Sequence, residues 1–185
     1  PGCEEDAVAA LFDDLGGQVP IYGGSSADNQ IAGEWWVADA LEVHPGGMLV
    51  SVLYPNASVL HAFHSSYVPT GATGLVTDAD DRTIQSIDGR PAATVYNEWT
   101  DGHFEGHLDG GNILAASTMT PLAIRVNSIG GGPYYRLLHP ESITNSDGIR
   151  LFADIEKGQE VTLMTTSSTD LVELVEAATD APAVG

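Results

Sequence analysis

The densest group of chemically versatile side chains lies in residues 103–109, where His103, Glu105 and His107 alternate with other residues. On an extended backbone, alternate residues share one face, so these three side chains would point the same way. Two histidines and a carboxylate are the ligand types of many transition-metal sites. The glycines of residues 102–111 instead favour a surface loop, in which polar side chains are simply solvated. A metal-dependent enzyme that uses His103, Glu105 and His107 is therefore one alternative hypothesis.

A second histidine pair, His61 and His64, lies in an apolar, strand-like run. Residues three apart on a strand point to opposite faces, so both rings cannot bind one ion without a bulge. Either histidine has the chemistry of an axial haem ligand. The chain has no Cys-x-x-Cys-His attachment motif, so this haem would be held non-covalently. Haem is thus an alternative cofactor, whereas hydrogen-bonded or exposed strand histidines are the commoner case.

Arg136 follows Tyr135 in a strand pattern and is one of only five arginines in the chain. A guanidinium on such a strand suits a bidentate clamp on a carboxylate. The carboxylate belongs either to an amino-acid-like ligand or to one of the chain's own acidic side chains. Tyr135 and Tyr96 are the aromatic residues that we expect to pack against a ligand.

A polar loop, Gly23-Gly24-Ser25, follows the short apolar run 19–22. Successive backbone N–H groups and a hydroxyl in such a loop can bind an anionic or polar group. The same residues also suit a tight turn that needs glycine at positive φ. The loop lacks the lysine and the spacing of a Walker motif.

Neither a nucleophile elbow, an ordered Ser-His-Asp set nor a Cys-His pair can be singled out in the chain. Cys3 is the single cysteine, so an intrachain disulfide is excluded. We therefore predict no catalysis, no catalytic residue and no resident cofactor or metal.

The chain's charge is strongly negative, with 26 acidic residues against 6 lysines and arginines and a formal net charge of −20. Such a surface repels nucleic acid and anionic membranes, and no apolar run approaches the ~20 residues that cross a bilayer. Self-repulsion opposes folding at low salt and is screened at molar salt. We expect a cytoplasmic protein of a salt-adapted, halophilic organism; an acidic mesophile protein with calcium or a basic partner is the alternative.

Helices and strands are expected in groups rather than in strict alternation. Apolar periodicity predicts helices over 4–15, 91–100 and 169–178 and strands over 19–22, 34–37, 47–54, 59–67, 75–77, 83–87, 122–126, 134–138, 149–153 and 161–164. Without β-α alternation a doubly wound parallel sheet is excluded. The pattern predicts an α+β fold with largely antiparallel sheets and a few packed helices, divided by a seam near residue 90.

Several short stretches together resemble the FIST sensory module, and they occur in the family's order over most of the chain. The stretches are residues 19–28, 74–79, 87–92, 135–136, 148–149, 153–155 and 157–164. The resemblance implies that residues 1–90 are the later part of the FIST N-terminal half and residues 91–185 the early part of its C-terminal half. Both ends of the chain are then expected to be cut within the module.

The resemblance also implies function, because FIST modules bind small ligands in prokaryotic signalling proteins and in some F-box proteins. Some FIST-like proteins are haem-based nitric oxide sensors, which links the haem alternative to His61 or His64. We predict a sensory domain that binds a small metabolite, such as an amino acid, in a cleft between its halves and passes the signal to a downstream signalling domain or protein. The expected ligand contacts are Gly23, Gly24, Ser25, Tyr96, Tyr135 and Arg136.

Overall fold

The computed structural model describes residues 4–27, 32–57, 59, 65–126 and 134–170. The chain forms two compact units, Pro1–Val59 and Leu60–Gly185, which are treated separately below. Within the described residues, every helix is too short or too polar to cross a membrane.

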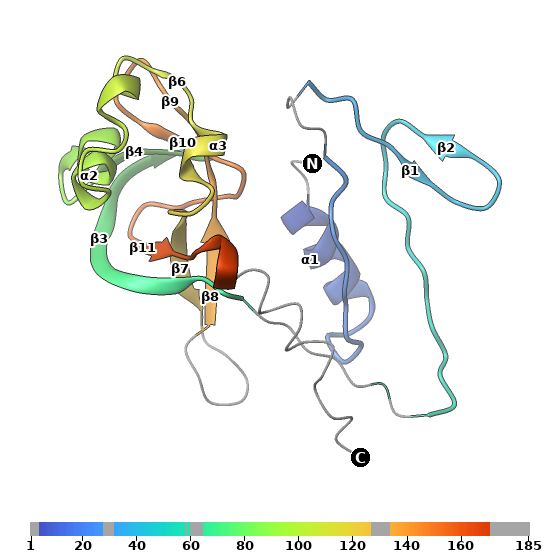
Figure 1. Cartoon of the computed structure of the whole chain (residues 1–185). Coiled ribbons are helices and arrows are strands. Elements are labelled where there is room, and N and C mark those ends of the chain that lie inside the picture. Colours follow the sequence, from blue (N-terminus) through green and yellow to red (C-terminus); the bar gives the residue numbers. More distant parts are fainter. Residues whose placement is uncertain (1–3, 28–31, 58, 60–64, 127–133, 171–185) are drawn as a thin grey trace. The chain divides into compact units, whose positions relative to one another are not determined.

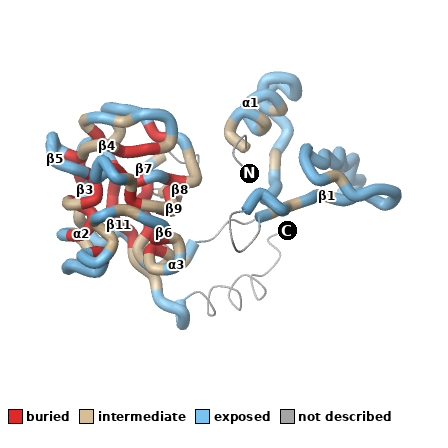
Figure 2. Tube along the Cα trace, turned by 90° about the horizontal axis from the view of Figure 1, so that it is seen from above, coloured by how far each residue is buried: buried red, intermediate tan, exposed pale blue. Residues whose placement is uncertain are grey.

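The first unit contains helix α1 (Glu4–Asp14), which confirms the helix expected near the start, and a small hairpin of β1 (Val37–Ala38) and β2 (Val43–His44). The Asp39 carboxylate closes the hairpin turn, because it accepts the backbone N–H groups of Leu41 and Glu42, each at 2.8 Å. These two bonds lower the pKa of Asp39. All described residues of this unit are at least partly exposed (Figure 2).

Three strand predictions in the first unit are wrong. Residues 19–22 and 47–54 form no strand, and of 34–37 only Val37 belongs to one. Apolar, β-prone sequence becomes a strand only when its backbone N–H and C=O groups find a partner strand. In the described part of the chain these segments have none. The run 59–67 falls mostly on residues outside the described ones.

The second unit is built on one curved, antiparallel, nine-stranded sheet (Figure 1). Its strands are β3 (Val68–Asp80), β4 (Thr83–Ile87), β5 (Arg90–Pro91), β6 (Gly111–Asn112), β7 (Leu122–Val126), β8 (Tyr134–Leu138), β9 (Pro140–Ile143), β10 (Ile149–Leu151) and β11 (Glu160–Thr165). The strand order is β6-β9-β10-β4-β3-β11-β7-β8, with β5 paired to β4. The α+β class with mostly antiparallel sheets is therefore confirmed.

Three short helical segments accompany the sheet: α2 (Ala92–Trp99), the 3₁₀ turn η1 (Glu105–His107) and α3 (Leu114–Ser117). Strands β4, β7 and β8 lie where the periodicity predicted them. The sequence analysis missed α3 and β9, which are four residues each and too short for a periodic signal. The expected C-terminal helix lies mostly outside the described residues.

The core of this unit is formed by apolar side chains from the inner face of the curved sheet and from α2 (Figure 2). Tyr96 of α2 is fully buried, stacks on Phe104 with ring centroids 4.7 Å apart, and donates its hydroxyl to the Thr120 carbonyl oxygen at 2.7 Å. Burial raises the pKa of Tyr96. A neutral, hydrogen-bonded tyrosine of this kind anchors the helix to the sheet.

Strand β3 is an inner strand of the curved sheet, with β11 on one edge and β4 on the other. The turn after β4 is bonded to Leu75 of β3: the Asp88 carboxylate accepts the Leu75 N–H at 3.0 Å, and the Asp88 N–H donates to the Leu75 carbonyl at 2.8 Å. Asp88 adopts a positive φ of 51°. At Gly74 an added Cβ would clash with Ile87 Cγ2, so the close approach of β3 to Ile87 requires glycine there. The turn around Asp88 is thus structural.

We expect Asp88→Ala to lower the free energy of unfolding by about 1–3 kcal/mol, because the Leu75 N–H loses its acceptor and alanine is strained at positive φ. Asp88→Asn is the matched control, since its amide oxygen still accepts and asparagine tolerates this conformation. Urea denaturation in molar KCl measures both variants. Equal losses for the two would contradict this role of the carboxylate.

His139 lies between β8 and β9, with its ring edge-on to Tyr67 at a centroid distance of 5.9 Å. Burial lowers the pKa of His139 below its usual value of 6.5. As pH falls through about 6.5, the unfolded chain therefore takes up this proton before the folded chain does.

Acidification from pH 7 towards pH 5 should consequently destabilise the fold through His139, with a slope of at most about 1.4 kcal/mol per pH unit for this one proton. Above about pH 7 the stabilising contribution of neutral His139 is fully present and no longer changes with pH. Replacing His139 by Gln should flatten the pH dependence of unfolding in this range. If the His139→Gln profile parallels the parent profile, another group is responsible.

Candidate functional site

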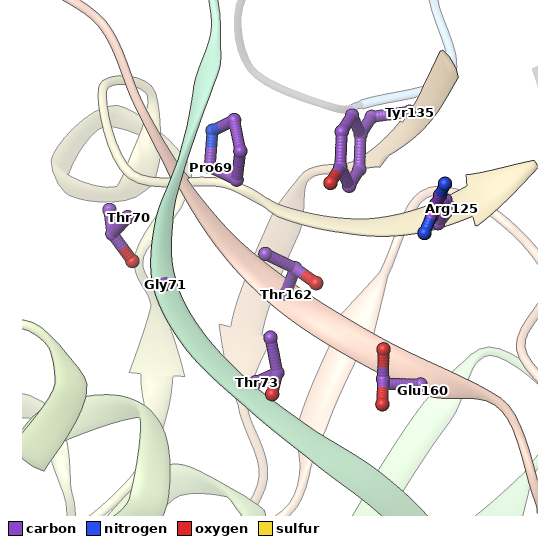
Figure 3. A pocket seen from close by; sticks show the side chains of 8 residues that line it. All are labelled: Pro69, Thr70, Gly71, Thr73, Arg125, Tyr135, Glu160 and Thr162. Atoms are coloured by element: carbon purple, nitrogen blue, oxygen red, sulfur yellow. The ribbon is translucent and has the colours of Figure 1, made fainter. Parts of the chain in front are cut away.

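A hollow of about 380 Å³ opens on one face of the sheet, over β3, β11, β7 and β8 (Figure 3). The polar side chains that line it from the last three strands are Arg125, Tyr135, Glu160 and Thr162. Strand β3 contributes the opposite wall, with Pro69, Thr70, Gly71 and Thr73. Every lining residue belongs to the second unit.

The β3 wall exists because β3 bulges away from β11. Thr162 pairs with Thr73 and Met164 with Pro69, so three β3 residues lie opposite the single residue Leu163. The Thr70 hydroxyl compensates for the interrupted ladder. It donates to the Leu163 carbonyl oxygen at 3.0 Å and accepts the Ala72 N–H at 3.2 Å. Bulges of this kind re-aim side chains and often border functional sites.

Sheet register brings Arg125, Tyr135 and Glu160 to the same face. Arg125 and Tyr135 are directly paired, and Glu160 is one step beyond the Val161–Ile124 pair in the β11–β7 register. Directly opposed residues of antiparallel strands present their side chains on one side of the sheet. The guanidinium and the carboxylate nevertheless form no ion pair with each other or with another described residue.

Arg125 differs in this respect from the other four arginines, all of which are described. Those four donate to acceptors of the chain: Arg82 to Asp154 Oδ1, Arg90 to the Glu98 carboxylate, Arg150 to Glu141 Oε2 and Arg136 to the Asp154 carbonyl oxygen. Within the described residues, Arg125 is thus the one guanidinium left to bind a group from outside. In a chain with formal charge −20 such a cation is unusual.

Thr162 supplies the most buried polar group of the hollow. It is only 5% exposed, yet its hydroxyl forms no hydrogen bond to a described residue. The hydroxyl oxygen itself is not among the buried polar atoms that lack a partner in the described chain, so it is accessible from the hollow.

Of the predicted ligand contacts, Tyr135 lines the hollow and Arg136 does not. Neighbouring strand residues face opposite sides, so Arg136 points away from the face of Tyr135 and donates to the Asp154 carbonyl at 3.1 Å. Tyr96 lies in the core, fully buried, and lines no part of the hollow.

The loop residues Gly23, Gly24 and Ser25 are exposed and belong to the first unit. The Ser25 hydroxyl donates to Glu4 Oε1 at 2.9 Å. A carboxylate beside the loop repels a second anion, so the contact disfavours anion binding. The tight-turn interpretation is wrong as well, since neither Gly23 nor Gly24 has a positive φ and residues 21–27 form no turn.

The metal-centre hypothesis for residues 103–109 fails on backbone geometry. Residues 105–107 form the 3₁₀ turn η1 rather than an extended strand, so the one-face alternation does not occur. The Glu105 carboxylate instead accepts a hydrogen bond from Asn97 Nδ2 at 2.9 Å. The His103 ring packs edge-on against the Phe104 ring. No three His, Cys, Asp or Glu side chains of the described chain converge on a metal position. His61 and His64, the haem candidates, lie outside the described residues.

Sequence reasoning missed Arg125, Glu160 and Thr162. Arg125 has the signal that singled out Arg136, a cation within an apolar strand. The sequence alone did not distinguish the two, because the choice depends on which strand face is covered by core and which is hollowed by the β3 bulge.

Comparison with known proteins gives a family. The family model described as the FIST N domain matches residues 2–90, and the FIST C domain model matches residues 92–184. No curated protein and no solved structure matches the chain.

The two matched regions contribute jointly to the sheet, since β3 and β4 come from the first and β11, β7 and β8 from the second. FIST domains are small-ligand sensory domains of signal transduction, which indicates a non-enzymatic role. With both domain models matched end to end along its length, this chain belongs to the FIST family.

Proposed function

We propose that the chain is a sensory module whose ligand, a small molecule with a carboxylate and an ammonium group such as a free amino acid, binds in the hollow lined by Arg125. The observation that carries the proposal is the guanidinium of Arg125, which borders the hollow and has no partner among the described residues, while the other four arginines bind the chain itself. Guanidinium–carboxylate pairs are among the strongest polar contacts in proteins.

The other lining groups complement such a ligand. The Glu160 carboxylate, opposite Arg125, suits an ammonium group, and the hydroxyls of Tyr135 and Thr162 suit the remaining polar atoms. A volume of about 380 Å³ lies at the lower end of the range usual for small-molecule sites. The lining contains neither histidine, cysteine nor lysine, so recognition without chemistry is the role that these residues support.

A bound ligand becomes a signal only if it favours one arrangement of the protein over another. We propose that the favoured arrangement is read by a downstream signalling domain or protein. The formal charge of −20 further supports the proposal that the module works in a salt-rich cytoplasm, where its self-repulsion is screened.

The first test is binding of an equimolar mixture of the twenty common L-amino acids, followed by each amino acid alone, measured by thermal shift and calorimetry in molar KCl. We expect Arg125→Gln to weaken binding about 10- to 100-fold, since it removes a charge-assisted hydrogen-bonded pair. Arg136→Gln is the matched control, because it removes a guanidinium one residue from Tyr135 that faces the other side of the sheet.

Binding that survives Arg125→Gln, or that Arg136→Gln abolishes equally, would overturn the assignment of the carboxylate contact. Absence of any shift with the mixture would overturn the proposed ligand class.

A second variant tests the ammonium contact. Glu160→Gln should weaken binding of an amino acid about tenfold or more, while leaving the affinity for the corresponding 2-hydroxy acid within about twofold, because only the former carries a cation for Glu160. Calorimetry on each pair of compounds measures the difference. Equal effects on both would show that Glu160 does not contact an ammonium group.

A further inference from the structure

The bulge beside the hollow contains an even number of extra β3 residues. Between Thr73 and Pro69, β3 has two more residues than β11 has between Thr162 and Met164. A one-residue slip of a strand moves every side chain to the other face. A two-residue slip keeps each side chain on its own face, so β3 can pair with β11 in a second register without exposing its core residues.

In that second register Met164 would lie opposite Gly71 instead of Pro69, and the ladder would continue from Thr162–Thr73 without interruption. Gly71 now has φ 94°, a conformation open to glycine but unfavourable for other residues. In a regular ladder it would become extended. The β3 wall of the hollow would then flatten onto β11, and the hollow over Thr162 would be lost.

Side-chain hydrogen bonds hold the bulged register. The Thr70 hydroxyl bonds the Leu163 carbonyl at the bulge itself. Just before β3, the Tyr67 hydroxyl donates to the Thr118 carbonyl at 2.9 Å, and the Thr166 hydroxyl donates to Ser66 Oγ at 3.0 Å. Each bond contributes little by itself, so together they oppose a regained ladder that also consists of a few hydrogen bonds.

We propose that β3 exchanges between these two registers, that Thr70 is the positioning residue which holds the bulged one, and that a ligand in the hollow acts by favouring it. Residues preceding the bulge would move by about 7 Å along β11 between the registers, at about 3.3 Å per residue. This inference rests on the proposed function for its ligand, while the exchange of registers can be tested without one.

Disulfide trapping tests the exchange in the full chain with Cys3→Ser. Val68→Cys with Thr165→Cys reports the bulged register, and Val68→Cys with Ser167→Cys reports the second one, because a two-residue slip brings Ser167 opposite Val68 and opposed strand residues meet the distance that a disulfide needs. Both pairs leave Gly71 unchanged, since a side chain at its positive φ would itself disfavour the bulged register. Thr73→Cys with Met164→Cys is opposed in neither register and measures the background from local unfolding.

Without amino acids, both reporting pairs should cross-link above that background under a glutathione redox buffer. The amino-acid mixture should lower the yield of the 68–167 bond at least threefold relative to the 68–165 bond. A 68–167 yield at background overturns the second register. A ratio that the mixture leaves unchanged, although the mixture shifts the melting temperature of the parent chain, overturns the coupling; absence of that melting shift instead counts against the proposed function.

Thr70 is tested separately, by variants without added cysteines. Thr70→Val should weaken binding of the mixture about tenfold and speed amide hydrogen exchange over residues 68–73, because it removes the hydroxyl and keeps the shape. Thr70→Ser should restore both, which a merely space-filling role would not predict. Unchanged binding and exchange in Thr70→Val would overturn the positioning role.

Discussion

The second unit depends on one strand, β3, which pairs with β11 along its first part and with β4 along its second. These two neighbours lie on opposite edges of β3, so this strand joins the β11 side of the sheet to the β4 side. The Asp88 carboxylate and the lack of a Cβ at Gly74 allow the turn after β4 to pack closely on β3. Because β3 joins the regions matched by the FIST N and FIST C domain models, the sheet, its core and its hollow all require both regions.

The hollow follows from the same strand. Extra residues in β3 interrupt its pairing with β11 opposite Leu163, and strand register places Arg125, Tyr135 and Glu160 around the opening. Arg125 and Glu160 thereby bring two opposite charges to one face, neither of them paired within the described chain. The hollow and its charged lining thus both follow from the register of neighbouring strands.

Charge is the other constraint on this protein. The chain has 6 lysines and arginines against 26 acidic residues. Four of its five arginines are bonded within the second unit, and two of them join segments far apart in the sequence, as Arg82 does with Asp154. Exposed ion pairs of this sort contribute little each. They matter here by contrast: among the described residues, Arg125 is the arginine whose guanidinium has no such partner.

Local sequence signals were sufficient for α1, β4, β7 and β8, the turn at Asp88, the α+β class and the family resemblance. Of the residues that the sequence offered as ligand contacts, Tyr135 lines the hollow, whereas Arg136 faces the other side of the sheet and Arg125 takes the place beside Tyr135. That placement, the 3₁₀ turn at residues 105–107 and the lack of a strand over 47–54 are visible only in the folded chain. Local periodicity predicts which residues share a face of a strand. Whether that face packs against the core or borders a hollow, and whether the strand finds a neighbour at all, depends on segments far away in the chain.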